Sequence, residues 1–181
     1  MKKNFYAGPS YLHDAVWKRF LDKIEKRDGI SILEISHRSP TIRRLFDETE
    51  DLIRNLASVP ESHEILFLQG GASMQFGMIP YNFLLPNRTA YYIDTGRWSK
   101  KALKEARKIG RAKSLASSAP NSYYNIPPIP PIPGDAAYVH LTSNNTVQGT
   151  QFPSLPVGDN RWVVDLSSDI FSRPVDFSNL D

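Results

Sequence analysis

The chain contains no cysteine among its 181 residues, which excludes disulfide bonds and thiolate chemistry. No apolar run approaches the length of a membrane span, and none of signal-peptide length follows Met1. The formal net charge is only +3 and the basic residues are scattered along the chain, so nucleic acid is not an expected partner. These absences predict a cytoplasmic protein that binds neither membrane nor nucleic acid, and no metal site is predicted.

What is present is typical of a globular protein, with 40% hydrophobic and 23% charged residues. A chain of this length is expected to form one domain and to bury about 70% of its unfolded surface. Helical patterns alternate with short apolar runs, which indicates βαβ units and an α/β fold with a largely parallel sheet flanked by helices. The expected strands are 64–68, 89–93, 112–117, 136–142 and 161–165.

Four helices are expected between these strands and before them. The first is predicted over 14–28, ending at Gly29, and the second begins at Pro40 after the capping residue Ser39. A third begins near Ala72, where Pro80 is expected to kink or end it. The fourth is predicted over 99–109.

Polar or small residues follow several of the predicted strands. Asp165 ends the run Trp162-Val163-Val164, and a buried carboxylate there needs a cationic partner. The protonated ring nitrogen of pyridoxal phosphate is one such partner, whereas a simple turn cap is the alternative.

Three further segments stand in the same relation to a strand. Gly70 and Gly71 precede Ala72 and Ser73 at a helix start, where backbone N–H groups can bind a phosphate, although no Walker or dinucleotide-binding glycine pattern occurs. Trp98 can stack on a planar heteroaromatic ring or fill the core. The run Ser143 to Thr146 offers side-chain donors. Ligands of open α/β sheets bind beyond the carboxyl ends of the strands, so these segments predict one shared site.

Six sequence motifs, in their order along the chain, resemble those of the phosphoserine aminotransferase family. The members of this family are pyridoxal-phosphate-dependent aminotransferases with the aspartate-aminotransferase-like fold. The resemblance covers nearly the whole chain. The motifs are Asn4 to Ser10, Ile35-Ser36-His37-Arg38, Gln69 to Phe76, Asp94 to Ser99, Leu141 to Thr146, and Asp165 to Pro174.

The resemblance implies a role for each matching residue. Ala72 and Ser73 would give backbone amides to the cofactor phosphate, and Trp98 would stack on the pyridine ring. Thr146 would contact the cofactor beside the ring, and Asp165 would pair with the ring nitrogen.

His37 and Arg38 would bind the substrate phosphate, since a guanidinium binds phosphate in a bidentate fork; a solvated turn is the alternative reading. The implied reaction exchanges an amino group between phosphoserine or 3-phosphohydroxypyruvate and glutamate or 2-oxoglutarate, in serine and pyridoxine biosynthesis. The full-length form is expected to be a homodimer.

The chain also departs from the family pattern. Asn145 stands where members commonly carry glutamate, which puts the local hydrogen bonding in doubt. Residues 119–135 form a proline-rich segment, which favours a stiff polyproline II connector. The alternative is that this segment is a ligand for a proline-recognition domain.

The family's Schiff-base lysine has no counterpart here, because Lys113 is the last lysine of the chain. Family members are also about twice this long. We therefore expect residues 1–181 to be an incomplete large domain, with 1–13 as its N-terminal segment, truncated before the lysine strand and the small C-terminal domain. Alone, it is expected to be inactive. The alternatives to a phosphoserine aminotransferase are a truncated protein with no catalytic role, or a related pyridoxal-phosphate aminotransferase of the same fold.

Overall fold

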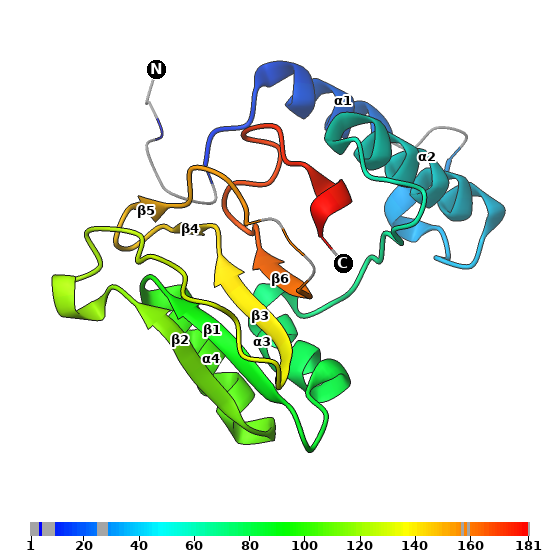
Figure 1. Ribbon diagram of the computed structural model, residues 1–181. Helices are drawn as coiled ribbons and strands as arrows, with labels where there is room; N and C mark the ends of the chain where they lie inside the picture. The colour runs from blue at the N-terminus through cyan, green and yellow to red at the C-terminus, as the bar shows by residue number, and fades with distance from the viewer. Residues whose placement is uncertain (1–3, 5–9, 25–28, 157, 159, 181) are drawn as a thin grey trace. The chain divides into compact units, whose positions relative to one another are not determined.

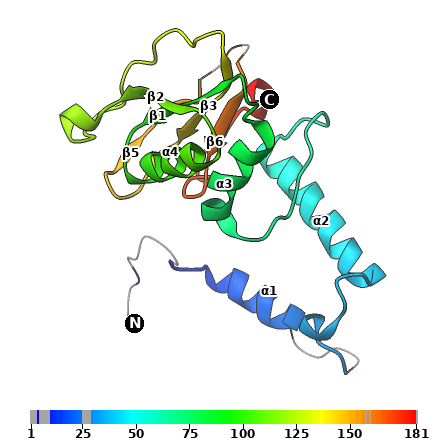
Figure 2. The same ribbon diagram turned by 90° about the horizontal axis from the view of Figure 1, so that it is seen from below.

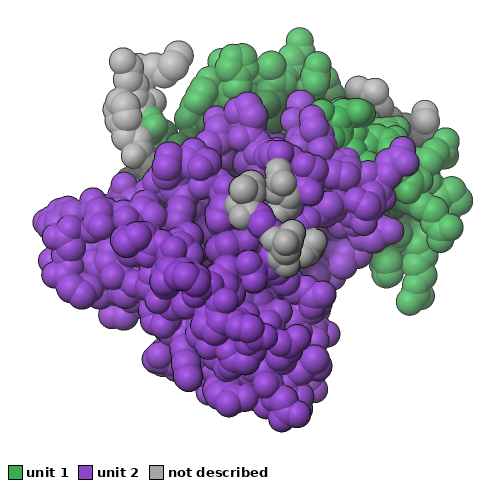
Figure 3. All heavy atoms as spheres, in the orientation of Figure 1, with its two compact units in different colours: residues 1–55 green, residues 56–181 purple. Residues whose placement is uncertain are grey.

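The computed structural model describes residues 4, 10–24, 29–156, 158 and 160–180 (Figure 1). The chain divides into two compact units, residues 1–55 and 56–181, which are coloured separately in Figure 3. The motif at 5–9 and the end of the first predicted helix, 25–28, lie outside the described residues.

The first unit contains α1 (Asp14–Ile24), the short 3-10 helix η1 (Ile32–Glu34) and most of α2 (Pro40–Ala57). The predicted start of α2 is confirmed, because the Ser39 hydroxyl accepts the backbone N–H of Ile42 at 3.2 Å. Along α1, the rings of Trp17 and Phe20 meet edge to face with their centroids 5.9 Å apart.

The second unit is built on a four-stranded parallel sheet, which confirms the predicted fold class. Four of the five predicted strands are present, with bounds that differ by at most one residue. The strand order is β2-β1-β3-β6, with β1 at Thr89–Asp94, β2 at Ala112–Ser117, β3 at Ala136–Thr142 and β6 at Trp162–Asp165.

Two helices cover one face of this sheet, α3 (Gly71–Phe83) and α4 (Arg97–Ile109), as Figures 1 and 2 show. Phe76 of α3 and Leu103 of α4 pack against Tyr92 and Tyr138 of the strands. Within this layer the hydroxyls of Tyr92 and Tyr138 are hydrogen bonded at 2.8 Å. The core that fixes the sheet therefore also fixes the helix starts at its edge.

The proline-rich connector packs on the opposite face of the sheet. Ile126, Ile129 and Ile132 contact the cluster that contains Tyr91 and Trp162. Their spacing of three residues matches the threefold period of a polyproline II helix, which places every third side chain on one side. The connector thus covers the sheet where a helix would otherwise be needed.

Short elements complete the second unit. β4 (Asn144–Asn145) and β5 (Thr150–Gln151) form a small antiparallel ribbon. The 3-10 helices η2 (Ala119–Asn121) and η3 (Phe177–Asn179) lie in the connecting segments.

Three sequence predictions are wrong in detail. The apolar run 64–68 is not a strand, and within the described residues it pairs with none; Leu66 remains 70% exposed. Of the two outcomes expected at Pro80, a kink or an end of the helix, the end is wrong, because α3 continues three residues past Pro80 to Phe83; the kink stays a prediction. Helix α4 begins at Arg97 rather than at Ser99.

Candidate functional site

The predicted site residues of the second unit gather at one edge of the sheet. Strands β1, β3 and β6 are parallel and end at Asp94, Thr142 and Asp165, so their carboxyl ends lie together. The starts of α3 and α4 and the β4–β5 ribbon border the same edge (Figure 1). This is the edge at which open α/β sheets bind ligands.

Trp98 lies in the first turn of α4, half-buried and outside the core clusters, so the core reading of this residue is wrong. Its indole Nε1 donates to Oγ1 of Thr146 at 2.9 Å, and its backbone N–H donates to Oδ1 of Asn145 at 3.1 Å. The ring is therefore held at both its backbone and its tip. Two predicted cofactor contacts, Trp98 and Thr146, are brought together directly.

Asn145 is fully buried and supports this arrangement. Its Nδ2 donates to Oγ1 of Thr95 at 2.8 Å while its Oδ1 accepts from Trp98. An amide supplies both a donor and an acceptor here, whereas an ionised glutamate would supply only acceptors. The departure from the family pattern at Asn145 thus leaves the local hydrogen bonding satisfied.

Gly96 makes room for the start of α4. A Cβ added there would lie 2.4 Å from Oε1 of Gln148, and the residue has a φ of +154°. The same Oε1 accepts the backbone N–H of Arg97 at 3.0 Å. A larger residue at Gly96 would push the Asn145 and Gln148 side chains away from the helix start.

The first turn of α3 is shaped as an anion cradle. Gly70 has a left-handed φ of +90°, and a Cβ there would lie 2.3 Å from Sδ of Met74. The N-cap residue Gly70 has no side chain, and within the described residues no side chain caps the helix, so the first-turn N–H groups, including those of Ala72 and Ser73, are left without a capping partner there. Uncapped N–H groups at a helix start are the chemistry that binds a phosphate.

Asp165 makes the turn-cap contacts that one reading of its sequence position expects, while the pairing with a cofactor ring nitrogen stays a prediction. Its Oδ1 accepts the backbone N–H of Ser167 at 3.1 Å and the Ser167 hydroxyl at 2.6 Å, which is a turn cap. Its Oδ2 accepts, among the described residues, only a long bond of 3.5 Å from the Thr142 hydroxyl. One carboxylate oxygen is therefore fixed while the other retains capacity for a cationic partner.

Ala72 and Asp165 line one cavity of about 630 Å³, together with side chains of α3 and β6. A residue that the sequence interpretation did not include, His140, also lines it. His140 is only 2% exposed, and burial lowers its pKa to about 4, although nearby Asp165 favours the charged form. Its Nδ1 has no hydrogen-bond partner within the described part of the chain. Only its place in a strand, two residues before Thr142, could have suggested it.

Two buried carboxylates at this edge are structural. Asp94 accepts from the hydroxyls of Ser117 at 2.9 Å and Tyr123 at 3.2 Å, and burial, with Asp94 as the next cause, raises the pKa of Tyr123 to about 12. Asp169 accepts from Ser143 and pairs with Arg173 at 3.4 Å. Asp94 thus joins the end of β1 to the end of β2 and the segment after it, and Asp169 joins the segment after β6 to the segment after β3.

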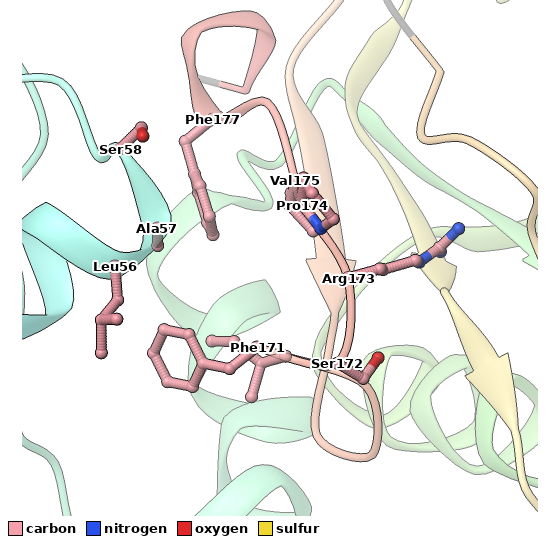
Figure 4. Close-up of a pocket in the computed structure, with 10 residues that line it drawn as sticks. Leu56, Ala57, Ser58, Phe171, Ser172, Arg173, Pro174, Val175 and Phe177 are labelled. Atoms are coloured by element: carbon pink, nitrogen blue, oxygen red, sulfur yellow. The ribbon is translucent and has the colours of Figure 1, made fainter.

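A second hollow, of about 500 Å³, is drawn in Figure 4. Its walls come from the end of α2 and from the segment 170–177, with Leu56, Phe171 and Phe177 contributing apolar side chains. None of the residues predicted to contact the cofactor lines it. It is therefore not part of the candidate site.

A third hollow, of about 820 Å³, gathers basic side chains of α4. The expectation that basic residues are scattered is wrong for this helix. The cationic residues that line the hollow are Arg97, Lys100, Lys101, Lys104 and Arg107.

His37 and Arg38 belong to the first unit, where both lie exposed in the turn that precedes α2. The backbone N–H of Arg38 donates to the Ser36 hydroxyl at 3.3 Å, and Ser39 caps the helix. The turn geometry leaves both side chains accessible to a ligand. Their role as a phosphate site stays a prediction.

The residues present fit pyridoxal phosphate. An uncapped helix start suits its phosphate, a fixed indole suits its ring, and a carboxylate with one oxygen to spare suits its ring nitrogen. Among the described residues, no helix combines the length and the apolarity needed to cross a bilayer.

Comparison with known proteins agrees with this assignment. Residues 3–181 match the family model described as "Aminotransferase class-V". The chain is 47% identical over 182 residues to the phosphoserine aminotransferase of Parabacteroides distasonis, covering 99% of this chain and 51% of that protein. The chain thus spans about half the length of the curated relatives it matches.

Solved structures show the same likeness. A phosphoserine aminotransferase studied for radiation damage of its Schiff base superposes with a TM-score of 0.95 at 39% identity, covering 99% of this chain and 51% of that one. The pyridoxal-phosphate-bound phosphoserine aminotransferase of Trichomonas vaginalis gives a TM-score of 0.90 at 32% identity, covering 99% and 55%.

Proposed function

The chain belongs to the class V aminotransferase family, and from that premise we propose that it forms the cofactor-binding part of a phosphoserine aminotransferase. The complete enzyme exchanges an amino group between phosphoserine or 3-phosphohydroxypyruvate and glutamate or 2-oxoglutarate. Residues 1–181 are the incomplete large domain of that enzyme. The observation that carries the proposal is the fixed pair of Trp98 and Thr146 beside the uncapped start of α3.

Each candidate residue has a defined task in this proposal. The backbone N–H groups of Ala72 and Ser73 bind the cofactor phosphate, and the indole of Trp98 covers one face of the ring. Thr146 fixes that indole, and the free oxygen of Asp165 holds the proton of the ring nitrogen. Bound pyridoxal phosphate supplies a protonated ring that withdraws electrons from the substrate carbon.

Asp165 is suited to its task because its two carboxylate oxygens differ in their hydrogen bonds. The Ser167 bonds fix the orientation of the carboxylate, so the second oxygen needs no reorganisation to meet a ring nitrogen. A charge fixed in this way favours the protonated ring over the neutral one.

His37 and Arg38 bind the phosphate of the substrate in this proposal. The guanidinium supplies a bidentate fork, and the imidazole adds a further donor. We place them in trans, in a homodimer whose site is built from both subunits. Homodimer assembly and a cytoplasmic location remain predictions from the sequence.

The test uses the complete translation product of the gene that carries this chain. With pyridoxal phosphate present, we expect amino transfer from glutamate to 3-phosphohydroxypyruvate, and much slower transfer to pyruvate, which lacks the phosphate. The 181-residue chain alone is expected to be inactive, because none of its lysines matches the family's Schiff-base position. Equal rates with both keto acids, or no cofactor binding by the complete protein, would contradict the proposal.

A further inference from the structure

Lys101 lies on α4 one turn after Trp98 and reaches across to the first turn of α3. Its Nζ lies 2.8 Å from Oγ of Ser73. The two helices lie side by side on the same face of the sheet (Figure 2). A cationic side chain of one helix is therefore bonded to the start of the other, where the phosphate of the proposed cofactor would bind.

The direction of this hydrogen bond follows from the groups involved. An ammonium group has three donors and no acceptor, so the Ser73 hydroxyl accepts. Its own proton is then directed elsewhere, and in the part of the chain that the structure describes it donates to no protein acceptor. Lys101 thus leaves the Ser73 hydroxyl ready to donate to an anion at the start of α3.

The charge of Lys101 is not neutralised by an ion pair within the described residues. Glu105, one turn further along α4, is bonded to Lys108 instead, and that bond is the chief cause of its lowered pKa. Lys101 has only a smaller effect on the same carboxyl. The ammonium is therefore available to compensate a negative charge brought in by a ligand.

Lys101 lies close both to the proposed ring contact and to the proposed phosphate contact. Its Nζ lies 5.7 Å from the ring centroid of Trp98, as well as 2.8 Å from the Ser73 hydroxyl. Trp98 is the proposed ring contact and Ser73 the proposed phosphate contact. A charge between them acts on a phosphate ester and on the orientation of its first-turn donor at once.

We propose that Lys101 is a positioning residue of the phosphate site, which orients the Ser73 hydroxyl and supplies a positive charge to a bound phosphate-monoester dianion. This assignment rests on the proposed function. The N–H groups of α3 are neutral donors, so a formal charge nearby strengthens the binding of a dianion more than that of a neutral ligand. Lys101 therefore sets the preference for the phosphorylated cofactor.

The test compares pyridoxal phosphate with pyridoxal, which has the same ring and aldehyde but no phosphate. Binding to the complete apo-protein is followed by quenching of tryptophan fluorescence, in the native protein and in Lys101→Ala, Lys101→Arg and Lys104→Ala. Lys104 is the matched control, because it is an exposed lysine on the same helix. All variants are first compared by thermal unfolding.

We expect Lys101→Ala to weaken the binding of pyridoxal phosphate about tenfold and to leave the binding of pyridoxal unchanged. Lys101→Arg should retain most of the affinity, and Lys104→Ala nearly all of it. Ser73→Ala combined with Lys101→Ala should cost less than the sum of the two single changes, because Lys101 acts through Ser73.

Equal losses for both ligands, no loss at all, or the same loss in Lys104→Ala would overturn the assignment of Lys101. These outcomes leave the proposed function standing, because the native protein still binds its cofactor. If the native protein binds neither ligand, the proposed function is wrong, and so is the assignment of Lys101, which rests on it.

Discussion

The indole Nε1 of Trp98 donates to Oγ1 of Thr146 across 2.9 Å, and this bond joins the start of α4 to the turn between β4 and β5. The two residues are far apart in sequence, yet the bond fixes the tilt of the ring before any ligand arrives. A preformed stacking surface reduces the entropy that a planar ligand must lose on binding. Substitutions that break this hydrogen bond are therefore expected to change the affinity for the cofactor.

Replacing Thr146 by valine removes the acceptor while keeping the shape of the side chain. We expect the affinity for pyridoxal phosphate to fall about fivefold to tenfold, since one hydrogen bond of about 1 kcal/mol is lost and the indole is released. Fluorescence titration of the apo-protein measures this. Thr146→Ser keeps the hydroxyl and should bind nearly normally; a loss as large as that of Thr146→Val would show that the methyl group, not the bond, matters.

Asp165→Asn should leave the fold intact and lower the turnover of the complete enzyme by roughly a hundredfold or more, because an amide cannot hold the ring proton by charge. Steady-state amino transfer measures the effect. Ser167→Ala, which removes only the hydroxyl bond to Oδ1, is the control and should have a much smaller effect. Near-normal turnover in Asp165→Asn would remove this residue from its role.

Arg38→Ala tests the substrate phosphate. We expect the KM for 3-phosphohydroxypyruvate to rise roughly tenfold to a hundredfold, because charge-assisted hydrogen bonds of about 1.5–3 kcal/mol are lost. The KM for glutamate should change little. Arg43→Ala removes an exposed guanidinium from the same unit and serves as the control. A similar rise for both substrates would argue against a phosphate contact at Arg38.

The hydroxyls of Tyr92 and Tyr138, buried and 2.8 Å apart, give a prediction about stability. Changing either residue alone to phenylalanine leaves its partner's hydroxyl unpaired, and we expect the free energy of unfolding to fall by about 1–3 kcal/mol. Changing both should cost less than the two single changes together. Urea unfolding of the four proteins measures the coupling, and strict additivity would show that the bond contributes little.

Local chemistry explains which parts could be predicted from sequence. The cap at Ser39, the glycines at the start of α3 and the carboxylate at the end of β6 each act over a few residues, so their patterns are visible in the chain. The strand ends then brought Trp98, Thr146 and Asp165 to one edge. The family resemblance added the roles that spacing alone does not supply.

The remainder depends on contacts between distant segments. The run 64–68 has the apolar pattern of a strand, but a strand needs a neighbour, and the pattern cannot show whether one is present. The bond between Lys101 and Ser73 depends on how α3 packs beside α4. Burial of His140 likewise depends on Phe76 and Tyr92, whose rings contact its own. None of these relations has a periodic signature.

His140 leads to the last prediction, which concerns pH. Its imidazole is buried against Phe76 and Tyr92, and the charge of Asp165 acts on its pKa in the opposite direction to burial. Burial lowers its pKa from 6.5 to about 4, so the folded protein keeps it neutral at pH values where the unfolded chain is protonated. The unfolded state thus binds more protons between these two values.

Above pH 6.5, His140 therefore takes nothing from the free energy of unfolding. As the pH falls toward about 4, protonation of the unfolded chain lowers that free energy by on the order of 3 kcal/mol in all. Urea unfolding at several pH values across that window should show the loss in the native protein. His140→Gln removes the titrating group, so its unfolding free energy should depend much less on pH there, even if the variant is less stable at pH 7. An unchanged slope in His140→Gln would show that other groups cause the acid sensitivity.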